Sequence, residues 1–441
     1  MNNSSLSAKE SLRKLLVLDT SYSLEAVRER QLIHSVTCRD LDGFFEHVWT
    51  VHPFASLVTS EGWAARCGKP DTHELTREHT FIEGKIGRYA TLQWIAPLNF
   101  LLSQLSLFVT LLRLIRREKI SVIRVGDPLY LGLFGWALSR LSGIPFLVRL
   151  NGNHDKVYET TGQPLQRRIF FNRKIEKFVE RFIFARVDLL AALNQDNLDF
   201  ALANGARPAF STLFRLGNLI DERHFVEPAS RPNARALLDE IGVQPGRFLV
   251  CIGRLESVKH PDDVVQVLAQ VRQRGYDVKG IFVGDGQMRQ TLEALAERLG
   301  VQSQVIFCGN KDQGWLAQVV PHAAAVVSPI TGRALTEAAL AAAPVVAYDI
   351  DWQREMVETG VTGELVPHLA IKEMVDSVVH FLDDRFYARA MGDAIRRRAM
   401  TMLDPTLLNQ HERDQYSLLL ARKRSGKNAT PPAPAGHING D

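Results

Sequence analysis

Cationic, glycine and carboxylate residues recur in the loops of one stretch of this 441-residue chain, residues 248–367. Guanidinium and ammonium groups, together with the unpaired backbone N–H groups at the start of a helix, bind anions such as a diphosphate. An ionised carboxylate can instead accept two hydrogen bonds from the hydroxyls of a ribose. The pattern therefore predicts a nucleotide site. Its expected residues are Gly253, Arg254, Lys259, Gly309, Asn310, Lys311, Thr331, Gly332 and Glu337.

The elements around these residues alternate between short apolar runs and longer helical patterns. Runs such as FLVCI, GIFV and PVVAY are apolar throughout, which is typical of parallel strands that are buried on both faces. Their alternation with helices predicts βαβ units on a parallel sheet, and hence an α/β fold. Ligands of such sheets bind at the carboxyl ends of the strands. The predicted site residues follow those ends.

The same stretch resembles the C-terminal domain of the GT-B glycosyltransferases, and specifically glycosyltransferase family 4. The family pattern contains G-R-L after a strand, then K-x-x-D, G-D-G, F-x-G, Glu-Ala, P-V-V, a further Glu and t-G-x-L-V-P. The matching residues are Gly253-Arg254-Leu255, Lys259 with Asp262, Gly284-Asp285-Gly286, Phe307 with Gly309, Glu337-Ala338, Pro344-Val345-Val346, Glu355 and Thr362-Gly363. The resemblance implies two Rossmann-like domains that face each other across a cleft, with C-terminal helices that cross back to the N-terminal domain.

The resemblance also implies a retaining glycosyltransferase, which moves a sugar from a nucleotide-sugar donor to a hydroxyl of a glycan or lipid-linked acceptor in polysaccharide or glycolipid assembly. Arg254 and Lys259 are the expected catalytic cations, because negative charge builds on the departing diphosphate. Glu337 would hold the ribose, and the base would lie near Asn310. No cofactor is expected. No metal is expected either, since cations meet the diphosphate.

Each of these residues also has a purely structural interpretation. Arg254 and Lys259 could form a solvated basic loop, and Glu337 could place its charge at the N-terminus of a helix. The G-D-G loop could be only a turn, and Glu355 could only brace the loop before it. A nucleotide-sugar hydrolase, an epimerase or an inverting transferase remains an alternative, because a fold does not fix its chemistry.

The sequence departs from the family pattern at three places. Pro329 stands where the family carries the first of two glutamates, the one that contacts the donor sugar. Asp351-Trp352 replaces a common Gly-Gly, so that Asp349 or Asp351 could supply a carboxylate. The loop after the first strand, residues 20–23, contains no glycine. Pro329 and the glycine-free loop keep open the alternative of a non-catalytic subunit that binds a partner enzyme or a glycan.

Polar residues also crowd the end of a strand in the N-terminal half, where RL is followed by NGNHD. The family places a histidine of this loop near the transferred sugar, and His154 is the expected match. A neutral imidazole can donate a hydrogen bond to a sugar hydroxyl or to the leaving oxygen. Asn153 and Asp155 are expected beside it. The alternative is a surface histidine without a role.

The resemblance to the GT-B fold also implies how the chain divides. We expect an N-terminal domain on the acceptor side over residues 1–226, followed by a Pro-containing linker. A nucleotide-sugar-binding domain is expected over 234–402 and a crossover helix over 403–424. The remaining residues, 425–441, read SGKNATPPAPAGHINGD. They are predicted to be disordered, because they hold almost no large apolar side chains.

The bulk composition is that of a soluble globular protein, with 46% hydrophobic and 23% charged residues. A net charge of +4 is too small to indicate nucleic-acid binding. The polar N-terminus lacks the apolar core of a signal peptide. The four cysteines show no C-x-x-C spacing. A cytoplasmic protein with reduced thiols is the expectation.

Two segments raise the question of membrane contact. Residues 94–115 are long and apolar enough to span a bilayer, but a buried helix is favoured over a span. Residues 166–186 form an amphipathic pattern with a basic face. Such a helix either packs on the domain and exposes its charges or lies on an anionic membrane. Peripheral contact with the inner face of a membrane is therefore kept as a possibility.

Overall fold

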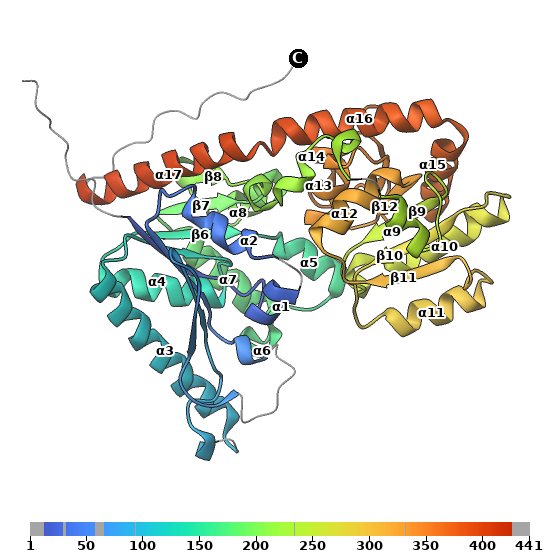
Figure 1. Ribbon diagram of the computed structural model, residues 1–441. Helices are drawn as coiled ribbons and strands as arrows, with labels where there is room; N and C mark the ends of the chain where they lie inside the picture. Colours follow the sequence, from blue (N-terminus) through green and yellow to red (C-terminus); the bar gives the residue numbers. More distant parts are fainter. Residues whose placement is uncertain are drawn as a thin grey trace, which may run out of the picture.

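The computed structural model describes residues 13–29, 32–57, 66–92, 94–232, 234–330 and 332–425 (Figure 1). Residues 426–441, which make up nearly all of the tail predicted to be disordered, lie outside this description. So does Thr331. The described chain forms two α/β domains, each built on its own sheet, and this confirms the predicted fold class.

The N-terminal domain contains an eight-stranded sheet in the order β3-β4-β2-β1-β5-β6-β7-β8. All neighbouring strands are parallel except β3 and β4, which form an antiparallel hairpin at one edge. The strands are β1 (Lys14–Leu18), β2 (His47–His52), β3 (Asp71–Thr76), β4 (His79–Glu83), β5 (Val122–Val125), β6 (Phe146–Leu150), β7 (Leu189–Ala192) and β8 (Ser211–Leu213).

Helices cover both faces of this sheet. One face packs against α3, α4, α7 and α8, and the opposite face packs against the C-terminal helix α17. The helices of this half are α1 (Leu24–Glu29), α2 (His34–Thr37), α3 (Ala96–Glu118), α4 (Tyr130–Ser142), α5 (His154–Thr161), α6 (Arg167–Phe170), α7 (Arg173–Phe184) and α8 (Gln195–Ala203).

The C-terminal domain contains a six-stranded sheet, parallel throughout, in the order β11-β10-β9-β12-β13-β14. Its central strand shows why the apolar runs are continuous: Phe248 and Val250 of β9 enter one core cluster, whereas Leu249 and Cys251 enter the cluster on the other face. The strands are β9 (Phe248–Ile252), β10 (Lys279–Val283), β11 (Val305–Gly309), β12 (Ala325–Ser328), β13 (Val345–Tyr348) and β14 (Glu364–Val366).

Different helices close the two core clusters of the C-terminal sheet, except that α16 contributes residues to both. Residues from α9, α12, α13 and α16 pack on one face, and residues from α10, α11 and α15 pack on the other. The helices are α9 (Arg235–Glu240), α10 (Pro261–Gln273), α11 (Arg289–Arg298), α12 (Gln313–Val319), α13 (Arg333–Leu340), α14 (Gln353–Met356), α15 (Ile371–Asp383), α16 (Arg385–Met402) and α17 (Pro405–Ser425).

The last two helices connect the domains. Figure 1 shows α16 above the C-terminal domain and α17 continuing over the N-terminal one. Asp404 stands between them, and its carboxylate accepts hydrogen bonds from the backbone N–H groups of Thr406 and Leu407 at 2.8 and 3.1 Å. Tyr416 and Leu419 of α17 are buried in the core of the N-terminal sheet. The return of a C-terminal helix to the first domain is therefore confirmed.

Helix α3 is the one helix in the described part of the chain that is long and apolar enough to cross a membrane. One of its stripes, which includes Leu107, Leu111 and Ile115, is buried against the N-terminal sheet. The side-chain amide of Asn99 exchanges hydrogen bonds with the backbone of Tyr89. The side-chain amide of Gln104 donates to the carbonyl oxygen of Pro53 and accepts from the hydroxyl of Tyr130. The opposite stripe is exposed at Leu101 and Leu105. The helix thus packs on its domain along one side only.

Candidate functional site

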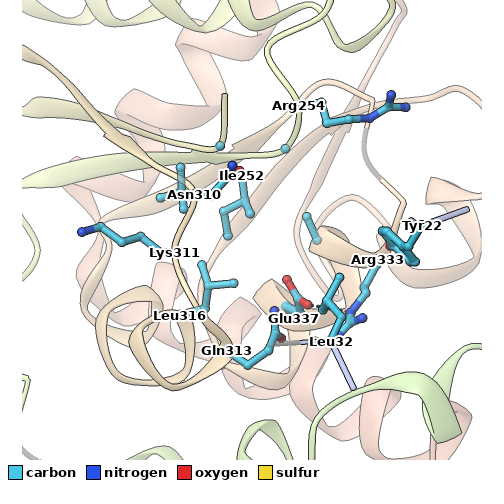
Figure 2. A pocket seen from close by; sticks show the side chains of 14 residues that line it. Tyr22, Leu32, Ile252, Arg254, Asn310, Lys311, Gln313, Leu316, Arg333 and Glu337 are labelled. Carbon is cyan, nitrogen blue, oxygen red and sulfur yellow. Dashed lines mark hydrogen bonds and ion pairs between the residues drawn. The ribbon is translucent and has the colours of Figure 1, made fainter. Parts of the chain in front are cut away.

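A pocket opens at the carboxyl ends of the C-terminal strands, where the sequence predicts the nucleotide (Figure 2). Its volume is about 180 Å³, and residues that follow β9, β10 and β11 line it together with residues of α13. Tyr22 and Leu32 of the N-terminal domain close one side. The predicted residues that line this pocket are Gly253, Arg254, Asn310, Lys311 and Glu337.

Glu337 is the acidic residue that lines this pocket within the described part of the chain. Its side chain is only 5% exposed, and its Oε1 pairs with the Nε of Arg333, one helical turn earlier, at 2.9 Å. Figure 2 shows both side chains on one side of the pocket with Gln313 beside them. A buried carboxylate held by one cation keeps acceptor capacity for ligand hydroxyls.

The two predicted catalytic cations differ in their surroundings. The side chain of Arg254 is 60% exposed, pairs with Glu256 at 2.8 Å and points away from Glu337 at the pocket rim (Figure 2). Lys259 lies in the adjoining cavity between the domains. Burial lowers the pKa of the Lys259 ammonium, and the nearby Arg254 guanidinium acts in the same direction. Water therefore screens the charge of Lys259 less than it screens the charge of Arg254.

The G-D-G loop has a packing role that accounts for two of its residues. A Cβ atom at Gly284, whose φ is +133°, would lie 2.0 Å from the carbonyl oxygen of Gly253. A Cβ atom at Gly286 would lie 2.5 Å from the carbonyl oxygen of Leu255. Glycine thus brings this loop against the G-R-L loop, and Gly284 also reaches the pocket wall.

A second cavity, of about 280 Å³, lies between the two domains and shares Tyr22 and Arg333 with the first pocket. It therefore continues the first pocket toward the N-terminal sheet. Two of its predicted residues, Lys259 and Gly332, come from the C-terminal domain. Its wall is formed by Asp19, Ser21, Tyr22, Ser35, Arg39, Arg124, Arg149, Asn151, Leu193, Asn194, Asn197, Leu216, Leu219, Lys259, Gly332, Arg333, Asp351 and Trp352.

The loop after β6 places its polar residues differently from the sequence prediction. His154 is buried, and its Nδ1 lies 2.8 Å from Oε1 of Glu180 on α7, inside the N-terminal domain. Asn153 caps α5 and donates to Asp196 at 3.0 Å, and Asp155 pairs with Arg173 at 2.8 Å. None of these three lines either of the two pockets just described.

Asn151, three residues before His154, is the residue of this loop that lines the interdomain cavity. Its side-chain amide donates to the carbonyl oxygen of Gly126 at 3.2 Å, which fixes the amide at the strand end. The histidine and its neighbours instead organise the helices behind the cavity wall. Whether His154 acts on the transferred sugar stays a prediction.

The remaining predicted residues are placed as follows. Gly332 precedes α13, and a Cβ atom there would meet nothing within 4 Å, so the backbone is open toward the cavity. Gly309 ends β11 with φ +65° and pairs with Gly284 across an isolated bridge. His260, Asp262 and Asp263 form a group of potential metal ligands at the start of α10. The absence of a metal requirement stays a prediction.

Polar contacts made by two residues of the C-terminal domain, Arg333 and Glu355, connect the domains beside the cavity. Arg333 donates to the hydroxyl of Ser35 at 2.8 Å. Glu355 pairs with Arg215 at 2.8 Å and accepts from the backbone N–H of Gln195, at the start of α8, at 2.8 Å. Glu355, whose role the sequence left open between ligand contact and bracing, thus joins α14 to the N-terminal domain.

Several cavity residues were missed by sequence reasoning. Arg124 and Arg149 interrupt the apolar strand runs VIRV and FLVRL, and a charged residue inside a buried strand is a signal that could have identified them. Arg333 stands four residues before Glu337, the spacing of an ion pair on one helix face. Arg39 lies in no motif, and its position depends on the tertiary fold.

Comparison with known proteins agrees with this geometry. Residues 240–398 match the family described as Glycosyl transferases group 1. The C-terminal domain is therefore similar in sequence to this family. This match contains Glu337, Lys259 and the glycine loops described above, and it bears out the resemblance stated from the sequence.

Relatives with a similar sequence are also named as glycosyltransferases. The alpha-D-kanosaminyltransferase of Streptomyces kanamyceticus is 24% identical over 57% of this chain, which spans 64% of that enzyme. A GDP-mannose-dependent mannosyltransferase acting on phosphatidylinositol monomannoside in Mycolicibacterium smegmatis is 28% identical over 69% of the chain and 78% of its own length. These matches support a transferase.

The fold matches a solved structure over nearly its full length. The crystal structure of Anabaena HepE in complex with UDP and glucose has a TM-score of 0.68, with 18% identity, and the match covers 92% of this chain and 100% of that one. The two-domain arrangement is therefore that of GT-B glycosyltransferases.

Proposed function

We propose that this protein is a retaining glycosyltransferase whose donor is a nucleotide-sugar bound by the C-terminal domain. The observation that carries the proposal is the pocket around buried Glu337, which lies at the strand ends of a group 1 domain and opens into the interdomain cavity. Relatives named for GDP-mannose and a fold neighbour complexed with UDP support a nucleotide donor. Turnover assays with different nucleotide-sugars identify the base and the sugar that this chain accepts.

The chemistry assigns separate tasks to the residues of the two pockets. Glu337 accepts hydrogen bonds from the ribose, and Arg254 holds the diphosphate at the rim. As the glycosidic bond breaks, charge builds on the diphosphate, and Lys259 stabilises that charge where solvent screening is weakest. A preorganised donor of this kind contributes on the order of 10²–10³ in rate.

Asp351 is the carboxylate that we assign to the sugar in place of the family's first glutamate. Pro329 occupies that position, and its carbonyl oxygen accepts a hydrogen bond from the buried amide of Gln353 at 2.8 Å. Asp351 lines the cavity with Lys259 and holds φ at +59°, a backbone conformation that is uncommon outside glycine. Asp349 instead pairs with Arg354 on the surface at 2.8 Å.

The test is donor turnover with the stereochemistry of the product. The full chain is incubated with UDP-, GDP- and ADP-sugars of known anomeric configuration, and the first product is read by proton NMR. Release or transfer of sugar with the donor's configuration supports the proposal. Inverted configuration would assign an inverting transferase. No turnover with any donor, combined with no nucleotide binding, would favour the non-catalytic subunit.

The acceptor side of the proposal includes contact with a cytoplasmic membrane surface. A relative acts on a phosphatidylinositol derivative. On this chain Phe171, Ile175 and Phe178 of the α6–α7 region are exposed, although Val179 and Ile183 of the same helix are buried. Exposed basic residues surround them, namely Arg167, Arg168, Lys174 and Arg181. Aromatic side chains among cations favour an anionic lipid surface.

Flotation with lipid vesicles tests this localisation. Vesicles that contain phosphatidylglycerol should carry the protein at low salt, and pure phosphatidylcholine vesicles should not. Phe178→Ser should lower the bound fraction severalfold. Phe386→Ser is the matched control, because Phe386 is 90% exposed on α16 of the other domain. Equal flotation of both variants, or none of the wild type, would overturn the membrane assignment.

A further inference from the structure

Three arginines lie together on the N-terminal side of the interdomain cavity. Arg39, Arg124 and Arg149 are 7%, 5% and 3% exposed, and all three line the cavity. Arg124 and Arg149 lie on adjacent strands and share the sheet face of Val122 and Leu147, the face that α17 covers. Arginine is rarely buried to this extent without a charged partner.

The counter-charges in this region are fewer than the cations. Asp19 pairs with Arg39. Glu412 of α17 is shared, since it stands 3.7 Å from Arg124 and 3.8 Å from Arg149. Both distances are too long for a hydrogen bond. One carboxylate thus faces two buried guanidinium groups.

The excess of positive charge extends to the whole described cavity wall. Its lining holds five cations, the three arginines with Lys259 and Arg333, and two acids, Asp19 and Asp351. Glu412 and Glu337 add two carboxylates behind the wall. Five cations and four carboxylates leave one net positive charge in a site of low dielectric constant, where an anion is attracted strongly.

Hydrogen-bond donors in the cluster are also unmet. Arg149 is fixed by its Nη2, which donates to the carbonyl oxygens of Phe214 and Arg215 at 3.2 and 3.3 Å. Its Nε and Nη1, and the Nε of Arg39, are buried without a hydrogen-bond partner among the residues that the structure describes. Burial lowers the pKa of Arg149 to about 10, and neighbouring Arg124 acts in the same direction. Unmet buried donors are costly, and a bound group that accepts from them removes that cost.

We propose that the acceptor of this protein carries an anionic group, a carboxylate or a phosphate, that binds at Arg39, Arg124 and Arg149. The proposal rests on the proposed glycosyl transfer, because it assigns the second substrate of the same cavity. Arginine suits either anion through its planar fork of N–H groups. Asn151 and Asn194, on the wall beside the arginines, offer amides to the hydroxyls of the same acceptor. The simpler role of anchoring α17 through Glu412 leaves the unmet donors unexplained.

Calorimetric titration of small anions into the full chain tests this site. The protein is first saturated with the nucleoside diphosphate that it binds, so that the donor pocket cannot capture the probe. Inorganic phosphate and succinate are then titrated as the phosphate and carboxylate probes, and erythritol as the neutral one. Wild type is compared with Arg149→Gln and Asp19→Asn. Arg389→Gln is the matched control, since Arg389 is 84% exposed on α16.

We expect one of the two anions to bind and erythritol not to bind. Arg149→Gln should weaken that binding at least tenfold, whereas Asp19→Asn should tighten it about threefold because it removes a competing carboxylate. Arg389→Gln should change nothing. The anion that binds more tightly identifies the acceptor's charged group.

No anion binding, or equal binding in both cavity variants, would overturn the proposal. If Arg149→Gln fails to fold, the opposite sign expected for Asp19→Asn still decides. Failure of nucleotide binding in the first step would count against the proposed function instead. In that case the anions are titrated into the unliganded protein, so the two failures are distinguishable.

Discussion

The carboxyl ends of the strands of both sheets face the same cavity, but the two sheets line it with different parts of the chain. The C-terminal sheet uses loops: Gly253, Gly284 and Gly332 bring backbone to the pocket, and Glu337 follows within one turn of a helix. The N-terminal sheet uses side chains that arise inside strands, such as Arg124 and Arg149, and one from a separate 3₁₀ turn, Arg39.

The proposed ligands of the two sites account for this difference. A nucleoside diphosphate is a constant group, so backbone N–H groups and one carboxylate in successive loops are enough to hold it. An acceptor varies, and its recognition depends on side chains from elements far apart in the chain. This explains why sequence motifs predict the residues of the donor side, whereas the residues of the acceptor side are found only in the folded structure.

The largest expected effect is on the donor side. Lys259→Ala should lower kcat on the order of 10²–10³-fold, because the buried ammonium stabilises charge that develops only as the diphosphate departs. Lys372→Ala, exposed on α15, is the control. Steady-state kinetics with the identified donor provide the measurement. An unchanged kcat in Lys259→Ala would show that Lys259 does not contribute to catalysis.

Alanine substitutions at two glycines distinguish a glycine needed for packing from a glycine needed for the approach of a ligand. Gly284→Ala should lower Tm by several degrees, because its methyl group would lie 2.0 Å from the carbonyl oxygen of Gly253. Gly332→Ala should leave Tm unchanged, since nothing lies within 4 Å of the added methyl group. It should nevertheless reduce turnover about tenfold, because the methyl group enters the cavity where a substrate approaches. Equal Tm values for the two variants would contradict this distinction.

On the N-terminal side, the lowered pKa of Asp19 should make the free energy of unfolding depend on pH. Burial raises its pKa, but the Arg39 guanidinium and the hydrogen bonds from Ser21 lower the pKa more, to about 2 from 3.8. The folded-state pKa is depressed, so the stabilisation is present above pH 4 and is lost as pH falls from 4 to 2. Asp19→Asn should therefore lower the free energy of unfolding by about 2 kcal/mol at pH 7.

Urea unfolding of wild type and Asp19→Asn across this range provides the check. The difference between the two proteins should shrink as pH falls from 4 to 2. A constant difference at every pH would mean that the carboxylate charge is not what stabilises the native state.

The smallest expected effect concerns the contact between the domains. Glu355→Gln removes the ion pair with Arg215 but keeps an acceptor for the N–H of Gln195. The donor KM should rise twofold to tenfold while nucleotide affinity stays unchanged, since the pair favours the closed arrangement of the domains. Arg215→Gln should give the same change. Loss of nucleotide affinity instead would place Glu355 in the donor site.

The sequence predicts the C-terminal domain well and the N-terminal site poorly, for physical reasons. Continuous apolar runs such as FLVCI indicated the buried parallel strands, and glycines at strand ends indicated the pocket. Residues 71–83 form an edge hairpin, β3 and β4, in a polar stretch of the sequence that shows no clear pattern of a strand or a helix. His154, which was matched to the family's loop histidine, begins α5 and is buried against Glu180, whereas Asn151 of the same loop lines the cavity.

The most direct test of the central claim is a calorimetric titration of UDP, GDP, ADP and CMP into the wild type and Glu337→Gln. The account predicts that one nucleotide binds the wild type and that the variant binds it about 10- to 100-fold more weakly, because a charged acceptor is replaced by a neutral amide. Glu297→Gln, exposed on α11, should bind like the wild type. Equal binding by wild type and Glu337→Gln, or binding of no nucleotide at all, would contradict the assignment of the donor pocket.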